Sequence, residues 1–297
     1  MICKLYAQIM DIVNTYLLCQ IFGMFCTIIK PNIWYYYRYT YNQIFDTIIL
    51  SRGRRAHALQ PMKGVITMTN GYYNEKILAK FGDALNAAKA AVKAGEETQV
   101  RFSGGNSKMG AVASVSTLPF FTCPGGCKDT CGKKCYAAKL ANLRPNVLRN
   151  YAVNTALAIY KPVEYWRQVG EYVKGCRFFR FHVSGDILNA AYFHHMVDIA
   201  LDNPHCEMLV FTKRYNVVNE WIDANGELPV NLHVLFSGWQ GLQPDNPHNL
   251  PETNVYTCDA DFDDSWLTCG GNCFECGCRG VGCWQAKKGD VIAFKMH

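Results

Sequence analysis

The sequence lacks the strong charge excess that marks many nucleic-acid-binding domains. Its 30 Lys and Arg against 24 Asp and Glu give a net charge of +6, and charged residues make up only 18% of 297 residues. This mildly basic balance permits an anionic partner such as nucleic acid without identifying one. After residue 62 the chain also lacks internal repeats and low-complexity linkers. With 49% hydrophobic residues, it is long enough to bury a substantial core as one large domain with appendages.

A cleavable secretion signal is not evident either, which bears on the fifteen cysteines. A secreted disulfide framework usually comes with such a signal and a small domain. Ten of the cysteines instead lie in or beside two short stretches, residues 123–135 and 269–283. Because thiolates are soft ligands, clustered cysteines in a reducing compartment favour bound zinc or an iron–sulfur cluster.

Residues 1–61 differ in composition from the rest of the chain. They are rich in Ile, Tyr, Phe and Asn, and their only acids are Asp11 and Asp46. The uncharged stretch between Asp11 and Lys30 approaches the length of a membrane span, but polar residues interrupt it. The bias matches translated AT-rich upstream DNA, and Met62 precedes ordinary sequence. We therefore expect an atypical N-terminal extension, dispensable for folding, and no membrane association.

Residues 62–257 alternate helical and strand patterns. Apolar residues recur at helical spacing over residues 74–94, and Gly95 stands where that helix would end. Strands are predicted at 100–102, 111–118, 177–183, 208–212 and 232–236, and further helices at 145–160, 163–173, 190–201 and 217–224. This α/β alternation predicts a parallel sheet with crossover helices, either an open doubly wound sheet or a full or partial barrel. In each case functional groups belong at the carboxyl ends of the strands.

The first cysteine stretch reads as a loop that wraps around a bound centre. Cys123, Cys127, Cys131 and Cys135 are spaced at intervals of four, but Pro124 and several glycines between them disfavour a regular helix. Three neighbouring lysines would lower thiolate pKa values and offset the charge of a thiolate-bound cluster. A purely structural zinc site is the alternative. The loop, residues 123–137, is our candidate for the chemically active site.

The second stretch belongs to a C-terminal cysteine-rich segment, residues 258–297. It is rich in glycine and too polar to fold without a ligand, so a bound metal would supply its folding energy. Zinc and a second iron–sulfur cluster both fit this spacing. The best four ligands are Cys269, Cys273, Cys276 and Cys283, with Cys278 or Cys258 as substitutes.

Several short motifs, taken in order, resemble known proteins. They are Asn106-Ser-Lys108, the loop ending Cys135-Tyr136-Ala137, His182-Val-Ser184-Gly185-Asp186, Phe211-Thr212-Lys213 and Cys283-Trp284. Together they resemble radical S-adenosylmethionine (SAM) enzymes and, more closely, the bacteriophage family called gene product 88. The resemblance covers residues 103–297 and implies a partial (β/α) barrel. Radical SAM enzymes usually separate their cluster cysteines by three and then two residues, whereas every gap in the first loop is three.

The resemblance also implies roles for the strand-end residues. If the first loop binds a 4Fe-4S cluster, Cys127, Cys131 and Cys135 are our preferred ligands and one iron stays open for SAM. Ser184, Gly185 and Asp186 would then bind the methionine ammonium, although such residues also cap helices. His182 is a candidate proton donor or a core histidine. Lys213, with its neighbour Arg214, is a candidate for holding an anionic group or a solvated helix start.

Two classes of function remain open at this level. The first is a cytoplasmic, radical-SAM-like phage protein that modifies a nucleic acid or small molecule in a bacterial host cell. The second is a zinc-stabilised nucleic-acid-binding or scaffold protein without catalysis. The substrate and the oligomeric state do not follow from the sequence.

Overall fold

The computed structural model describes residues 71–258 and 262–296. The chain divides into two units, residues 1–65 and 66–297, and all described residues belong to the second. The predictions for residues 1–61 therefore fall outside the described residues. No helix within the described ranges is long and apolar enough to cross a bilayer.

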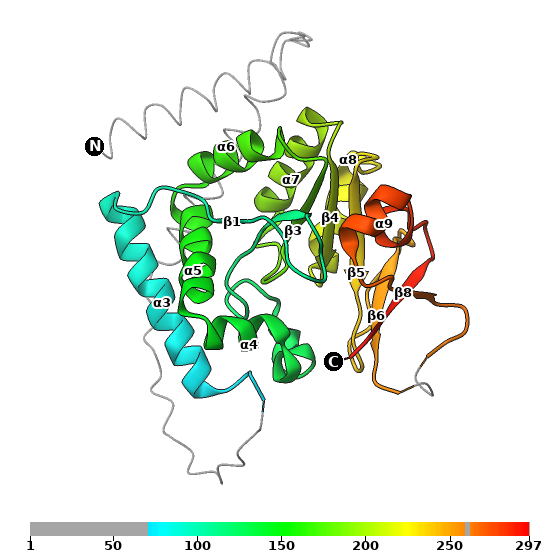
Figure 1. Cartoon of the computed structure of the whole chain (residues 1–297), viewed down its shortest axis with the longest axis horizontal. Coiled ribbons are helices and arrows are strands. Elements are labelled where there is room, and N and C mark those ends of the chain that lie inside the picture. Colours follow the sequence, from blue (N-terminus) through cyan, green and yellow to red (C-terminus); the bar gives the residue numbers. More distant parts are fainter. Residues whose placement is uncertain (1–70, 259–261, 297) are drawn as a thin grey trace, which may run out of the picture. The chain divides into compact units, whose positions relative to one another are not determined.

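The centre of the fold is an eight-stranded mixed sheet in the order β1-β2-β3-β4-β5-β6-β8-β7 (Figure 1). The strands are β1 Phe102–Ser103, β2 Ala113–Val115, β3 Phe178–Phe181, β4 Glu207–Thr212, β5 Leu232–Ser237, β6 Glu252–Tyr256, β7 Leu267–Thr268 and β8 Val291–Lys295. Only β1 pairs antiparallel; the other neighbours pair parallel. The sheet is open, because β1 and β7 form its two edges.

Seven α-helices accompany the sheet in the described ranges. They are α3 Glu75–Ala94, α4 Tyr136–Leu143, α5 Pro145–Tyr160, α6 Pro162–Val173, α7 Ala190–Asp202, α8 Tyr215–Asn225 and α9 Cys273–Arg279. Strands β2 to β6 lie side by side in chain order, without the reversal that defines a doubly wound sheet. Because parallel crossovers share one hand, this order places successive crossover helices on the same face. The doubly wound alternative is therefore wrong.

The two faces of the sheet pack against different partners. In β3, Phe179 and Phe181 join the core formed with the helices, whereas Phe178 packs with Trp284 in a smaller core on the other face. This follows from the strand period of two, which sends successive side chains to opposite faces. The smaller core also contacts Cys269, Cys273, Cys276 and Cys283. The C-terminal cysteine-rich segment thus covers the face of the sheet opposite the main helical core.

Helix α3 confirms the helix predicted from apolar spacing. Asn74 caps it by accepting a hydrogen bond from the Ile77 backbone N–H at 3.0 Å, and Gly95 ends it with φ +80°. The predicted strand at 177–183 is shorter, because the backbone at His182 turns to φ +58°. Strands β6, β7 and β8 were not predicted. Strands β7 and β8 flank the cysteine stretch at residues 269–283, which the sequence analysis assigned to a metal-binding segment outside the sheet.

Candidate functional site

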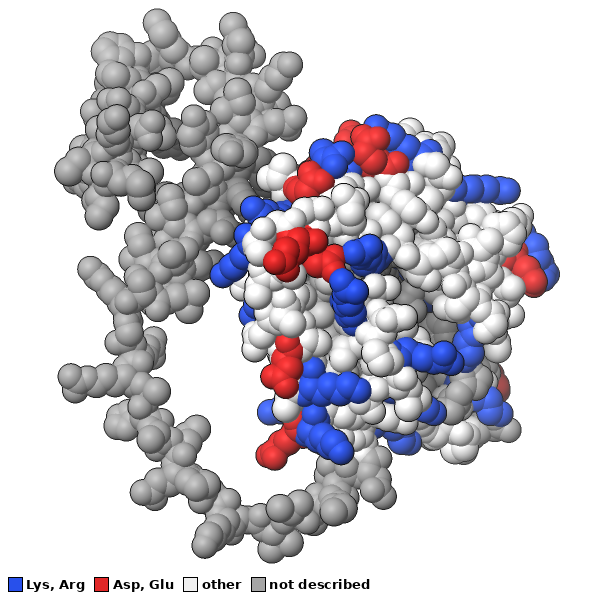
Figure 2. Space-filling model, turned by 60° about the vertical axis from the view of Figure 1, so that its left-hand side comes forward, with Lys and Arg blue, Asp and Glu red and all other residues white. Residues whose placement is uncertain are grey.

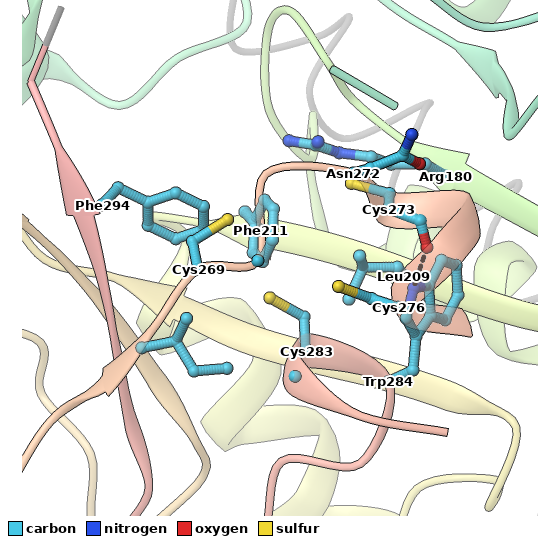
Figure 3. Close-up of a pocket in the computed structure, with 13 residues that line it drawn as sticks. Arg180, Leu209, Phe211, Cys269, Asn272, Cys273, Cys276, Cys283, Trp284 and Phe294 are labelled. Atoms are coloured by element: carbon cyan, nitrogen blue, oxygen red, sulfur yellow. Dashed lines mark hydrogen bonds between the residues drawn. The ribbon is translucent and has the colours of Figure 1, made fainter. Parts of the chain in front are cut away.

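Four cysteines of the C-terminal segment surround one cavity of about 40 Å³, which we call the thiol pocket (Figure 3). They are Cys269, Cys273, Cys276 and Cys283. Figure 3 shows their sulfur atoms directed toward a common space. The same four residues were chosen as the second metal-ligand set from their spacing. Cys278 is exposed and does not line this pocket.

Hydrogen bonds within the C-terminal segment, and from it to the turn at Asn106–Gly110, hold the walls of the pocket in place. Asn272 caps α9 by accepting from the Glu275 backbone N–H at 3.2 Å. The Trp284 indole donates to the Cys273 carbonyl at 2.8 Å, and Trp284 is only 2% exposed. The backbone N–H groups of Cys273 and Phe274 donate to the carbonyls of Lys108 and Met109. The turn that includes Asn106–Gly110 therefore supports α9.

Close packing requires a glycine at position 277. A Cβ atom there would lie 2.7 Å from the Phe178 ring, a distance at which something must shift. The wall of the pocket is otherwise largely apolar and includes Leu209, Phe211 and Ile292. The thiols therefore lie in a poorly solvated environment, in which burial raises the pKa of Cys283 to about 12.

Arg180 is the charged residue that the sequence analysis missed. It extends from β3 to line the thiol pocket, and its guanidinium carbon lies 4.5 Å from the centre of the Phe211 ring. Its Nε is buried without a hydrogen-bond partner. Burial raises the pKa of Cys273, and the charge of Arg180 and its hydrogen bond to that thiol counteract the rise. The only sequence signal was a basic residue within an aromatic strand.

The first cysteine stretch folds into two 3-10 turns, Gly125–Lys128 and Cys131–Lys134, followed by α4. The pKa of the Cys127 thiol is raised because it hydrogen-bonds to the thiols of Cys123 and Cys131. The Cys131 pKa is lowered to about 6, first by its hydrogen bond with Cys127. We call Cys123, Cys127, Cys131 and Cys135 the loop thiols.

Cys135 has an additional structural role. Its sulfur accepts a hydrogen bond from the Ala138 backbone N–H at 3.4 Å, so it caps α4. Burial raises its pKa to about 12. Cys135 also interacts electrostatically with Cys123 and Cys131, so the choice of Cys127, Cys131 and Cys135 as the cluster ligands stays a prediction.

The loop thiols lie at the carboxyl ends of the parallel strands, as predicted. Lys213 directly follows β4, and its charge helps to lower the Cys131 pKa. The Lys213 ammonium donates to the Ser237 hydroxyl, at the end of β5, at 2.5 Å. Tyr136, after the last loop cysteine, donates to the Val183 carbonyl at 2.5 Å and interacts electrostatically with Cys135 and Cys273. Both groups of thiols are therefore close to Tyr136.

Two of the predicted SAM-binding residues shape the turn after β3. Gly185 has φ +78°, and a Cβ there would lie 2.0 Å from the Thr117 hydroxyl. Asp186 is 4% exposed. It accepts hydrogen bonds from the Thr212 hydroxyl at 2.5 Å and from the backbone N–H groups of Ile187 and Lys213, each at 2.8 Å. Burial raises the Asp186 pKa, against these hydrogen bonds.

Three further residues near the strand ends were also candidates for ligand binding or catalysis, and all three lie largely within the protein. His182 is 3% exposed, and its Nε2 lies 3.0 Å from the Tyr192 hydroxyl; burial lowers its pKa to about 3. Arg214 donates to the Ile187 and Thr122 carbonyls at 3.0 Å each, which ties the strand ends together. Ser184 is 2% exposed, and its hydroxyl lies close enough to Tyr151 that a hydrogen bond between them counteracts the rise of the Tyr151 pKa to about 12 that burial causes.

In residues 71–258 and 262–296, no group of three or more Cys, His, Asp or Glu side chains is arranged to hold a metal ion. All twelve cysteines in these ranges are free of disulfides. The arrangement that the structure does show is two groups of thiols, one at the strand ends and one on the opposite face from the main helical core.

Fold and site together define an α/β protein with an open, singly wound sheet and two cysteine groups. Residues 78–280 match the family model of gene product 88, and the chain belongs to that family. No curated protein and no solved structure matches the chain. The resemblance to radical SAM enzymes stays a prediction.

Proposed function

We propose that this protein is an iron–sulfur enzyme of the radical SAM type, with its reactive cluster on the loop thiols. The observation that carries the proposal is the meeting of Cys123, Cys127 and Cys131 beside Lys213, at the carboxyl end of β4. Parallel α/β enzymes place their active sites at this edge of the sheet. Three thiolates would leave one iron of a four-iron cluster open to a ligand.

Such a cluster, when bound, supplies one electron to the sulfonium of SAM. The chain's own residues would bind and orient the molecule. The Ser184 hydroxyl is buried beside Tyr151, and its oxygen can accept a hydrogen bond from a ligand ammonium group. Lys213 would attract a ligand carboxylate. Asp186 has an indirect role, because it fixes the turn between these two residues.

The open, singly wound sheet supports the proposal, since a partial barrel has the same order of strands and crossover helices. The nucleic-acid-binding alternative has less support. On the face shown in Figure 2, basic side chains lie among acidic ones beside a broad uncharged area. A nucleic-acid site usually gathers basic residues on one face. A nucleic acid remains a candidate substrate of the proposed enzyme.

Anaerobic purification followed by iron, sulfide and zinc analysis tests the proposal. We expect brown protein, an electron paramagnetic resonance (EPR) signal after reduction that changes when SAM is added, and slow SAM cleavage. The Cys127→Ser variant should lose the SAM-dependent change, whereas Cys176→Ser, far from both groups in sequence, serves as the matched control. Protein that holds only zinc after expression with iron and sulfide available would refute the proposal and favour the zinc-stabilised alternative.

A further inference from the structure

The thiol pocket and Arg180 carry a further inference, which rests on the iron–sulfur part of the proposed function. The spacing of the cysteines leaves zinc and a second cluster equally suitable. The structure adds the size of the pocket that the thiols help to line and the side chain that enters this pocket from the sheet.

No group of three or more thiols in the described residues is arranged to hold a metal ion as the side chains stand, and the size of the pocket favours several metal atoms over one. In a tetrahedral zinc site the Zn–S bonds are about 2.3 Å long, so the four sulfurs are about 3.8 Å apart and leave no room for a water molecule. The thiol pocket, which the four cysteines share with nine other lining residues, instead has a volume of about 40 Å³, whereas a single water needs only roughly 10–15 Å³. A polynuclear cluster fills such a space with metal and sulfide.

Arg180 then has a partner for its unsatisfied group. Its Nε is buried without a hydrogen bond, which is costly for a charged side chain. The guanidinium is held in place by the Phe211 ring, 4.5 Å away. A thiolate or sulfide in the pocket would accept the missing hydrogen bond. Arginine provides several donors in a fixed plane, which a flexible lysine cannot reproduce.

We infer that the thiol pocket binds an iron–sulfur cluster and that Arg180 is a positioning residue that raises its reduction potential. Reduction adds one negative charge to the cluster. A buried cation that donates a hydrogen bond to its sulfur stabilises the reduced form more than the oxidised form. The apolar wall of Leu209, Phe211 and Ile292 strengthens this effect, because it excludes water that would screen the charges.

The experiment isolates the pocket in the full-length chain. A Cys127→Ser, Cys131→Ser background removes the loop cluster, so the remaining EPR signal and roughly four irons per chain report on the pocket. Redox titration then compares Arg180→Met and Arg180→Lys in this background. Arg177→Met is the matched control, because Arg177 also lies against an aromatic ring, that of Phe178 at 5.0 Å, but does not line the pocket.

We expect Arg180→Met to lower the pocket potential by at least the equivalent of a tenfold shift in the reduced-to-oxidised ratio, about 59 mV for one electron. In Arg180→Lys the pocket potential should lie between those of the Arg180→Met variant and the unchanged residue. In Arg177→Met the pocket potential should not change. Zinc alone in the pocket would overturn the inference, as would a potential that is equal in all variants. If Arg180→Met fails to load iron, an unchanged potential in Arg180→Lys decides against the role of Arg180. Absence of SAM cleavage by the wild-type chain, with an intact pocket signal, would refute the proposed function but leave this inference standing.

Discussion

The two groups of thiols differ in what surrounds them, although both are glycine-rich in sequence. The loop thiols lie in short 3-10 turns beside exposed lysines, near Lys213 at the strand ends. The thiols of the pocket lie against the sheet among Leu209, Phe211 and Trp284. Similar cysteine spacings can therefore be placed in different surroundings and suit different functions. A site at the strand ends can receive a ligand, whereas a site packed against the sheet among apolar side chains is suited to stability and to tuned electron transfer.

The largest expected effect is on stability, from the thiol pocket. Replacing Cys273 and Cys276 together by Ser should remove the pocket metal and destabilise the protein by about 3–5 kcal/mol, the range of the largest substitution effects, because metal binding at a structural thiolate site contributes to folding. Thermal unfolding and metal analysis measure both quantities. Unchanged melting with unchanged metal content would contradict a structural role for this site.

The loop thiols should show the opposite pattern. Cys127→Ser should abolish the SAM-dependent EPR change and SAM cleavage, while the free energy of unfolding falls by no more than about 2 kcal/mol. The reason is that the strands and helices around the loop keep their own core. A variant that unfolds as readily as the pocket double mutant would remove the distinction between the two sites.

A pair of glycine substitutions compares the packing of the two regions without touching a sulfur. Gly277→Ala should cost about 1–3 kcal/mol, since its methyl group would meet the Phe178 ring at 2.7 Å. Gly125→Ala, in the first loop, has no atom within 4 Å of the new methyl group and should change stability by about 0.5 kcal/mol or less. Chemical denaturation measures both. Equal effects would mean that the C-terminal segment packs no more tightly than the loop.

The smallest expected effect concerns thiol reactivity in metal-free protein. The Cys131 pKa is lowered to about 6 by its hydrogen bond with Cys127 and, further, by Lys213, whereas burial raises the Cys283 pKa to about 12. Because the thiolate is the nucleophile, iodoacetamide should label Cys131 well already at pH 7. Between pH 7 and 9 the labelling rate of Cys283 should still rise with pH. The labelling rate of Cys131 should no longer change over the same range. Mass spectrometry follows each site, and parallel pH profiles would contradict the assigned environments.

Local patterns predicted much of the fold. Apolar spacing and the flanking Asn74 and Gly95 predicted α3 correctly, because caps and amphipathic periodicity are local properties. The strand ending near His182 was predicted too long, since nothing in the residue type reveals the positive φ at that position. Among the site residues, spacing alone identified the four cysteines that line the pocket. Ligand binding by Asp186 stays a prediction; its carboxylate accepts three hydrogen bonds from its own chain, which no local pattern indicated.

Residue types and their spacing were enough to predict two cysteine groups, an α/β alternation and a candidate active site at the strand ends. The three-dimensional fold was needed to see that the C-terminal segment covers the sheet opposite the main helical core, and that Arg180 lines the thiol pocket. The physical reason is that these contacts join segments far apart in the chain. Strand order and the face to which each side chain points fix them, and neither is encoded in a local pattern of residues.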